Sequence, residues 1–125
     1  MKYKILVIIL LIFEIIVIYK GDGVSMEYID IKELNENSFI LDVRTKEEVN
    51  SVHLTLPFIH EDSTTINVKD FINRYDLKNK NITVNILCHS GRRAEQVAKE
   101  FIKNNYNNVK VVKGGIQEIK EKIKE

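Results

Sequence analysis

The sequence predicts an α/β fold, with a mostly parallel central sheet and helices on both of its faces. Short apolar runs rich in β-branched residues alternate along the chain with segments whose apolar residues recur at helical spacing. Strands that alternate with helices pair in parallel, because each helix returns the chain to the end of the sheet where the previous strand began. The 125 residues are 44% hydrophobic and 30% charged, which is the balance of one globular domain rather than of a disordered chain.

The N-terminal part of the chain is predicted to target a membrane. Residues 5–19 form an apolar run that is interrupted only by Glu14 and preceded by Lys2 and Lys4. Basic residues followed by such a run are typical of a cleaved signal peptide or of a membrane anchor. The run is shorter than the roughly 17 residues of a full span and carries a charge, which favours a signal peptide. Lys20, however, crowds the region of cleavage, and we favour the anchor.

This segment sets the expected organisation and location of the chain. We expect an anchor or signal at residues 1–20, a short joint at 21–25 and one domain at 26–125. Because basic residues precede the apolar run, the domain is expected in the cell envelope, on the non-cytoplasmic side of the membrane. Three lysines and one glutamate in residues 1–20 leave 16 basic and 17 acidic residues for the remainder. This near-neutral remainder argues against a nucleic-acid partner, which would need a basic face.

The first half of the domain is predicted to hold two short helices and two strands. Two capping boxes mark the helices, Asp30 with Glu33 and Thr45 with Glu48. Pro57 limits the second strand to a sheet edge or a bend. In order, the predicted elements are a helix from Asp30 through Leu34, a buried strand at 39–41, a helix from Thr45 to about Asn50, a strand at 54–59 and a loop at 60–67.

The second half of the domain is predicted to alternate helices with strands. Apolar residues recur at helical spacing in three segments, and β-branched runs between them predict the strands. In order, the elements are a helix with Val68, Phe71, Ile72 and Tyr75, a turn at 79–81, a strand at 82–87, a helix with Ala94, Val97, Ala98, Phe101 and Ile102, a strand at 109–112, a turn at Gly114 and Gly115, and a terminal helix with Ile116, Ile119 and Ile123.

Cys88 is the one cysteine of the chain, and it follows the strand at 82–87 and precedes the next helix. In parallel α/β sheets the working site lies at the carboxyl ends of strands, near a helix N-terminus. Unpaired amides and the helix dipole favour negative charge there, and therefore a thiolate. A lone cysteine in an apolar strand is nonetheless more often an inert core residue. The position of Cys88 alone leaves both interpretations open.

The residues after Cys88 favour the reactive thiol. Ser90 and Gly91 are small, so the loop can curl with successive amides pointing inward as an anion-binding nest. Positive charge beside a thiol favours the thiolate. That charge comes from His89, Arg92 and Arg93. We therefore interpret Cys88 as a catalytic nucleophile and residues 89–93 as its binding loop.

Four motifs, in order along residues 26–123, resemble the rhodanese-like family. The family shows Leu-Asp-x-Arg at a strand end, then Glu-Glu-(Phe/Tyr)-x-x-Gly-His-Ile, Cys-x-x-Gly-x-Arg at its cysteine, and Leu-x-Gly-Gly near its C-terminus. The matching residues are Leu41, Asp42 and Arg44; Glu47, Glu48, His53 and Leu54; Cys88, Gly91 and Arg93; and Val112, Gly114 and Gly115. The chain departs from the family at Val52, where glycine is usual, at 55–57 in place of Pro-Gly-Ala, and at Ile119, where tryptophan is common. These departures bear on substrate choice.

The resemblance implies a three-layer rhodanese-like fold and a sulfurtransferase that needs no cofactor. Cys88 would take a sulfane sulfur from a small anionic donor such as thiosulfate, hold it as a persulfide, and give it to a thiol or cyanide. The amides of residues 89–93 would stabilise the persulfide, or Arg93 would turn inward and tie the loop to the fold. Asp42 and Arg44 are expected to form a supporting ion pair.

The same residues allow three other interpretations. Many rhodanese-like domains serve as non-catalytic binding or persulfide-carrier modules, and a retained cysteine does not exclude this. Cysteine phosphatases resemble Cys-x5-Arg, but here four residues separate Cys88 from Arg93, a smaller loop that suits sulfur better than phosphate. A metal site is not expected, because His53, His60, Cys88 and His89 do not reproduce a recognised ligand spacing.

Overall fold

The computed structural model describes residues 26–116. The predicted segment at 1–20, the joint at 21–25 and the terminal helix beyond Ile116 lie outside the described residues. Within the described part of the chain, no helix is both long enough and apolar enough to cross a membrane. The elements in order are β1 (Tyr28–Ile29), the 3-10 helix η1 (Ile31–Glu33), β2 (Phe39–Asp42), α2 (Lys46–Ser51), β3 (Ile59–His60), α3 (Val68–Arg74), α4 (Leu77–Lys80), β4 (Val84–Leu87), α5 (Arg92–Lys103) and β5 (Val109–Val112).

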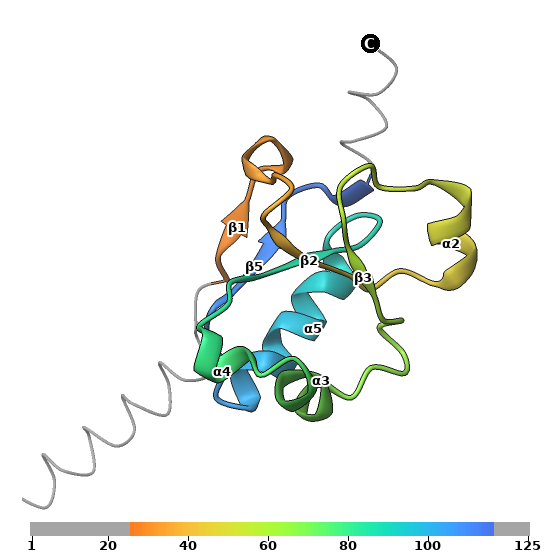
Figure 1. The fold of residues 1–125 in the computed structure, drawn as a ribbon. Helices are drawn as coiled ribbons and strands as arrows, with labels where there is room; N and C mark the ends of the chain where they lie inside the picture. The colour runs from red at the N-terminus through yellow and green to blue at the C-terminus, as the bar shows by residue number, and fades with distance from the viewer. Residues whose placement is uncertain (1–25, 117–125) are drawn as a thin grey trace, which may run out of the picture.

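The five strands form one parallel sheet in the order β1-β5-β4-β2-β3 (Figure 1). In register, Leu41 of β2 lies opposite Ile86 of β4, which lies opposite Val111 of β5. All strands therefore end at the same edge of the sheet, and the loops after β2, β4 and β5 meet there. The predicted α/β fold with a parallel sheet is confirmed, because each strand is returned to the same end by the segment that follows it.

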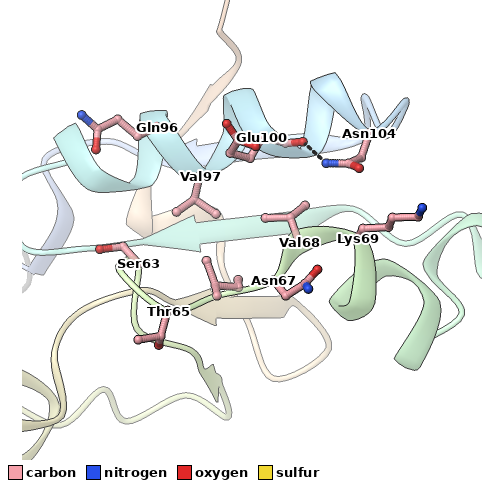
Figure 2. A pocket seen from close by; sticks show the side chains of 10 residues that line it. Ser63, Thr65, Asn67, Val68, Lys69, Gln96, Val97, Glu100 and Asn104 are labelled. Carbon is pink, nitrogen blue, oxygen red and sulfur yellow. Dashed lines mark hydrogen bonds between the residues drawn. The ribbon is translucent and has the colours of Figure 1, made fainter.

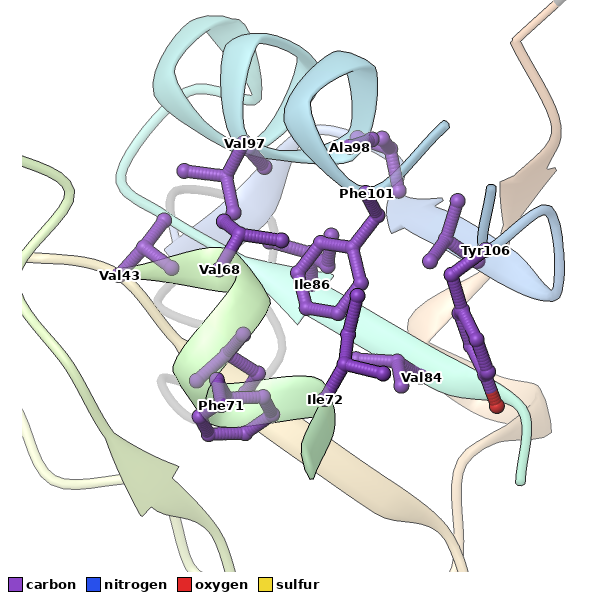
Figure 3. Packing of buried hydrophobic residues seen from close by; sticks show 14 of the residues in the cluster. Val43, Val68, Phe71, Ile72, Val84, Ile86, Val97, Ala98, Phe101 and Tyr106 are labelled. Carbon is purple, nitrogen blue, oxygen red and sulfur yellow. The ribbon is translucent and has the colours of Figure 1, made fainter. Parts of the chain in front are cut away.

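One face of the sheet is covered by α3, α4 and α5. Val97, Ala98 and Phe101 of α5 and Phe71 and Ile72 of α3 pack over Val84 and Ile86 of the central strand β4 (Figure 3). Val84 and Ile86 of β4 point to this face, whereas Leu87 of the same strand points to the other face of the sheet. The apolar face of α5 is the one that its helical spacing predicts.

The other face carries a smaller core. Leu87, Ile40 of β2 and Val112 of β5 form it with Leu34, Leu54 and Ile116, and all six are buried. Among the described residues, its cover comes from η1 and from the irregular segment 52–58, whose apolar side chains pack against this core. The two faces therefore differ, since α-helices cover the first, whereas a 3-10 turn and an irregular segment cover much of the second.

The elements predicted around Thr45, in the helix at 68–75, in the strands at 82–87 and 109–112 and in the helix after Cys88 are confirmed. The strand predicted at 54–59 is wrong, because only Ile59 and His60 pair with β2. The segment before Ile59 instead turns Leu54 inward onto the second core, so it does not keep an extended strand. The helix predicted from Asp30 is a single 3-10 turn, with the Asp30 carboxylate accepting from the amide of Lys32.

Two elements were not predicted. β1 is a two-residue edge strand that pairs with β5, Tyr28 opposite Val111. The turn expected at 79–81 is the end of a short helix, α4, closed by Asn81 in the left-handed conformation at φ 51°. Both are too short to give the periodic pattern on which a sequence prediction rests.

Candidate active site

Cys88 lies directly after β4, at the point where the Cys88 loop (residues 88–93) leads into α5. The residue is fully buried. Its Sγ accepts a hydrogen bond from the amide of Gly91 at 2.9 Å and a longer one from the amide of Ala94 at 3.4 Å. Gly91 has a φ of 104°, which turns the chain so that its amide points back at the sulfur. Two amides at the start of a twelve-residue helix stabilise negative charge on that atom.

The predicted site residues fall into two groups. The amide of Gly91 donates to the Cys88 sulfur, as expected of the predicted nest. The amide of Ala94, which the sequence did not single out, donates to it as well. His89, Ser90 and Arg92 are exposed on the outside of the Cys88 loop. They do not donate to Sγ among the described hydrogen bonds.

The back of the Cys88 loop rests on the turn after β5. The amide of Ile116 donates to the carbonyl oxygen of Cys88 at 2.9 Å. Gly115 lies so close that a Cβ there would be 2.3 Å from the Cys88 oxygen and 2.6 Å from the His89 oxygen. Its φ of 59° also disfavours other residues. The sequence predicted a tight turn at this position but not its contact with Cys88.

Arg93 is tied to α2. Its Nη1 and Nη2 donate to Oε1 and Oε2 of Glu48 at 2.6 and 2.8 Å, a bidentate ion pair. The alternative in which Arg93 turns inward and ties the loop to the fold is therefore the one observed. The Arg93 guanidinium lowers the pKa of Glu48 to about 2, with help from the amide and hydroxyl of Thr45, while partial burial opposes the shift. The same contact raises the pKa of Arg93.

The predicted ion pair of Asp42 and Arg44 is confirmed, and both side chains are buried. Arg44 Nη2 and Nε donate to the Asp42 carboxylate at 2.8 to 3.1 Å. Nη1 also donates to the carbonyl oxygen of Glu48 at 3.1 Å, and Nη2 to the carbonyl oxygen of Val52 at 2.9 Å. His60 Nε2 lies 2.6 Å from the Arg44 carbonyl oxygen. Each of the three guanidinium nitrogens thus donates to the protein, which fits the supporting role expected of Arg44.

These contacts form a chain from the sheet to the nucleophile. Asp42 orients Arg44, Arg44 fixes the backbone of α2, and the Glu48 side chain holds Arg93 of the Cys88 loop. Glu48 had been identified only as a helix cap and as a motif residue. Its capping box forms as predicted, and the same carboxylate serves Arg93, 45 residues away. No local pattern in the sequence signals that long-range pairing.

A hollow adjoins the Cys88 loop, and a larger one lies elsewhere on the described part of the molecule. One of about 170 Å³, the site hollow, adjoins the Cys88 loop and is lined by Arg44, Glu48, Ser51, Val52, His89 and Ile116. A larger one of about 550 Å³ lies between α5 and the segment 63–69, with Val97 and Val68 facing each other across it and Gln96, Lys69 and Asn67 among its polar residues (Figure 2). The larger hollow contains no residue of the Cys88 loop, whereas the smaller one is lined by His89 of that loop. Residues 26–116 contain no cluster of three or more side chains that could hold a metal ion.

Comparison with known proteins identifies the family. The model of the family described as Rhodanese-like domain matches residues 26–122. Because this match covers most of the chain, the protein belongs to the rhodanese-like domain family. No match is found among curated proteins. The resemblance expected from the four motifs, with its three-layer rhodanese-like fold, is confirmed at the level of family and fold.

Solved structures of related proteins share this fold. SSP1007 from Staphylococcus saprophyticus subsp. saprophyticus is 27% identical with a TM-score of 0.57, over 74% of this chain and 92% of that one. A rhodanese-like domain protein from Staphylococcus aureus is 24% identical with a TM-score of 0.56, over 74% and 89% of the two chains, and its likeness concerns the fold alone. A NAD-dependent persulfide reductase from A. fulgidus is 25% identical with a TM-score of 0.54, over 82% of this chain but 17% of its own.

Proposed function

We propose that this protein is a sulfurtransferase that carries a sulfane sulfur as a persulfide on Cys88. The observation that carries the proposal is the pair of amides, from Gly91 and Ala94, that point at the Cys88 Sγ. Preorganised donors of this kind stabilise charge on an atom without any rearrangement during the reaction. The family of the chain supports the same class of enzyme.

The proposed reaction has two steps. The Cys88 thiolate attacks the outer sulfur of a donor such as thiosulfate, the S–S bond of the donor breaks, and sulfite leaves. A thiol or cyanide then attacks the outer sulfur of the persulfide and regenerates the Cys88 thiolate. Such covalent catalysis shows ping-pong kinetics. The amides of Gly91 and Ala94 hold the negative charge in both forms of the enzyme.

The alternative is a persulfide carrier or binding module without turnover. Full burial of Cys88 favours a binding module that transfers no sulfur, because any donor must reach a sulfur atom that solvent does not. A cysteine phosphatase is disfavoured on geometric grounds. A phosphatase would need an arginine of the Cys88 loop to bind the phosphoryl group. Arg93 instead forms a bidentate ion pair with Glu48.

For the location of the domain, we propose attachment to a membrane through residues 1–20, with the domain in the cell envelope. Support comes from the apolar run at 5–19 and the lysines that precede it. Fractionation of cells that express the full chain tests this, with the mass of the mature protein distinguishing an anchor from a cleaved signal. Recovery of the uncleaved chain in the cytosolic fraction would exclude both.

The test of function compares the wild type with Cys88→Ser. The wild type is expected to gain the mass of one sulfur atom on Cys88 after incubation with thiosulfate and to form thiocyanate when cyanide is added. Cys88→Ser is expected to do neither, whereas Lys99→Ala, an exposed position of α5 outside the loop, serves as the control. Sulfur loading without turnover would support the carrier, and equal activity in Cys88→Ser would exclude the mechanism.

A further inference from the structure

The larger hollow, between α5 and the segment 63–69, has a closed apolar floor and a polar border (Figure 2). Val68 and Val97 are only 5% and 3% exposed, so they close the hollow from below and offer a ligand little surface. Its volume of about 550 Å³ lies within the roughly 300–1,000 Å³ of ligand sites. The side chains that a ligand can contact are mainly exposed or partly exposed polar ones, among them Thr65, Asn67, Lys69, Gln96, Glu100 and Asn104.

One cation and one anion border the larger hollow, and they stand on different helices. Lys69 belongs to α3 and Glu100 to α5, and both side chains are exposed. No ion pair joins the two among the described residues. Glu100 Oε1 lies 3.3 Å from Nζ of Lys103, one turn further along α5, which leaves Oε2 open to a ligand. The hollow therefore presents two opposite charges in separate places.

This arrangement of charge selects among ligand classes. A ligand with a net negative charge would be attracted by Lys69 and repelled by Glu100, and a net positive ligand would meet the reverse. An uncharged ligand would gain from neither side chain. A zwitterion whose two charges are held apart can pair with both, and it is the class that the hollow favours.

Three side-chain amides border the same hollow, and each keeps a group free for a ligand among the described hydrogen bonds. Asn67 Oδ1 accepts from the amide of Asp70, so its Nδ2 is left as a donor. Asn104 Nδ2 donates to the carbonyl oxygen of Glu100, so its Oδ1 is left as an acceptor (Figure 2). Gln96 has both its groups available. A peptide bond offers one N–H and one C=O, which match this set of donors and acceptors.

We infer that the larger hollow binds a short peptide of about three residues with both ends free. Its carboxylate pairs with Lys69, its ammonium pairs with Glu100, and its peptide bonds meet the side-chain amides between them. A free amino acid has no peptide bond to offer these amides. The inference goes beyond the proposed function, because no residue of the Cys88 loop lines the larger hollow.

The inference is tested by titrating the full chain with four probes in a calorimeter. The probes are trialanine, N-acetyl-trialanine, trialanine amide and free alanine. Trialanine is expected to bind with a dissociation constant on the order of 1 mM, as suits a small ligand in an open polar hollow. Blocking either end is expected to weaken binding about fivefold, the effect of one ion pair that solvent partly screens. Free alanine is expected to bind more weakly than either blocked peptide.

Two variants locate the ends of the peptide. Lys69→Met and Glu100→Gln change exposed side chains and are each expected to weaken trialanine about fivefold. Lys69→Met should leave the affinity for trialanine amide unchanged, because that probe has no carboxylate to lose, and should still weaken N-acetyl-trialanine. Glu100→Gln should show the opposite pattern.

The controls keep the inference separate from the chemistry at Cys88. Lys99→Met and Glu36→Gln change exposed charges that do not line the hollow and are expected to bind trialanine like the wild type. Cys88→Ser is expected to do the same. A wild type that binds free and blocked peptides equally, that prefers free alanine or that binds no probe would overturn the inference. So would equal losses in Lys69→Met and Lys99→Met, and each of these results would leave the proposed sulfurtransferase untouched.

Discussion

The Cys88 loop is held from two sides, and the two sides use different chemistry. On the side of α2, ion pairs hold it, a buried one between Asp42 and Arg44 and a partly exposed one between Glu48 and Arg93. On the side of β5, the backbone holds it, through the Ile116 amide and the close approach of Gly115. The ionic side responds to pH and to the loss of a single charge, whereas the backbone side responds only to changes of shape. Substitutions on each side can therefore measure what each contributes.

The largest effect is expected from Asp42→Ala, which breaks the buried part of the ionic side. It leaves the Arg44 guanidinium buried without its carboxylate, and breaking such a pair costs about 3–5 kcal/mol. Urea unfolding measures this loss as a fall in the free energy of unfolding. The double variant Asp42→Ala/Arg44→Met, which removes both charges, is expected to recover part of it. If Arg44→Met lowered the free energy of unfolding further in the Asp42→Ala background, by as much as an independent substitution would, the two residues would not act as a pair.

Gly115→Ala tests the backbone side and is expected to cost about 3 kcal/mol. The new Cβ would meet the Cys88 oxygen at 2.3 Å, in addition to the strain of a positive φ. Gly91→Ala is the comparison, since it also has a positive φ but would place its Cβ with no heavy atom within 4 Å. Unfolding in urea should rank Gly115→Ala as the more destabilised. The reverse order would mean that the contact with Cys88 yields easily and does not brace the loop.

A smaller effect is expected from Glu48→Gln, which removes the charge of the exposed ion pair but keeps an oxygen for the helix cap. Because the pair is partly open to solvent, its loss is expected to cost about 1 kcal/mol. The second expected effect is slower sulfur loading of Cys88, since Arg93 then lacks the carboxylate that fixes it. Glu47→Gln, the neighbouring exposed residue, provides the control. Equal loading rates in the two variants would show that the loop does not depend on the ionic side.

The smallest effect concerns pH. The pKa of Glu48 is lowered from 4.5 to about 2 in the folded protein, so its pairing stabilises the fold above pH 4.5. That contribution is lost as the pH falls from 4.5 towards 2, where the carboxylate becomes protonated in the folded state as well. The difference in unfolding free energy between the wild type and Glu48→Gln should therefore shrink over this interval. A difference that stays constant from pH 5 to pH 2 would contradict the ion pair as its source.

The sequence predicts those parts of the fold in which a local pattern and a long-range contact agree. The capping box of Thr45 and the apolar stripe of α5 are local features, and both form as expected. The strand predicted at 54–59 is wrong. Local preference favours an extended chain there, whereas packing of Leu54 against the second core decides the shape of the segment. Edge strand β1 was not predicted, because its pairing with β5, rather than a local pattern, gives its two residues their structure.

The candidate site divides in the same way. The position of Cys88 and the turn at Gly91 follow from order along the chain, which a sequence displays. The partner of Arg93 does not, because Glu48 is 45 residues away and meets it only through the register of the parallel strands. Asn85 shows the same limit. It reads as an awkward polar residue in a strand, and the structure gives its side-chain amide the carbonyl oxygen of Phe39 as acceptor.

The hydrogen bond from Ile116 to Cys88 has a consequence for the order in which the molecule assembles. Ile116 follows β5, the strand that comes last along the described chain and lies between β1 and β4 in the sheet. The Cys88 loop therefore lacks this hydrogen bond until β5 has inserted between its neighbours. A chain that is still emerging from the ribosome, or one that is arrested before β5, keeps Cys88 without its finished cradle. Completion of the sheet therefore comes before completion of the loop that holds the thiol.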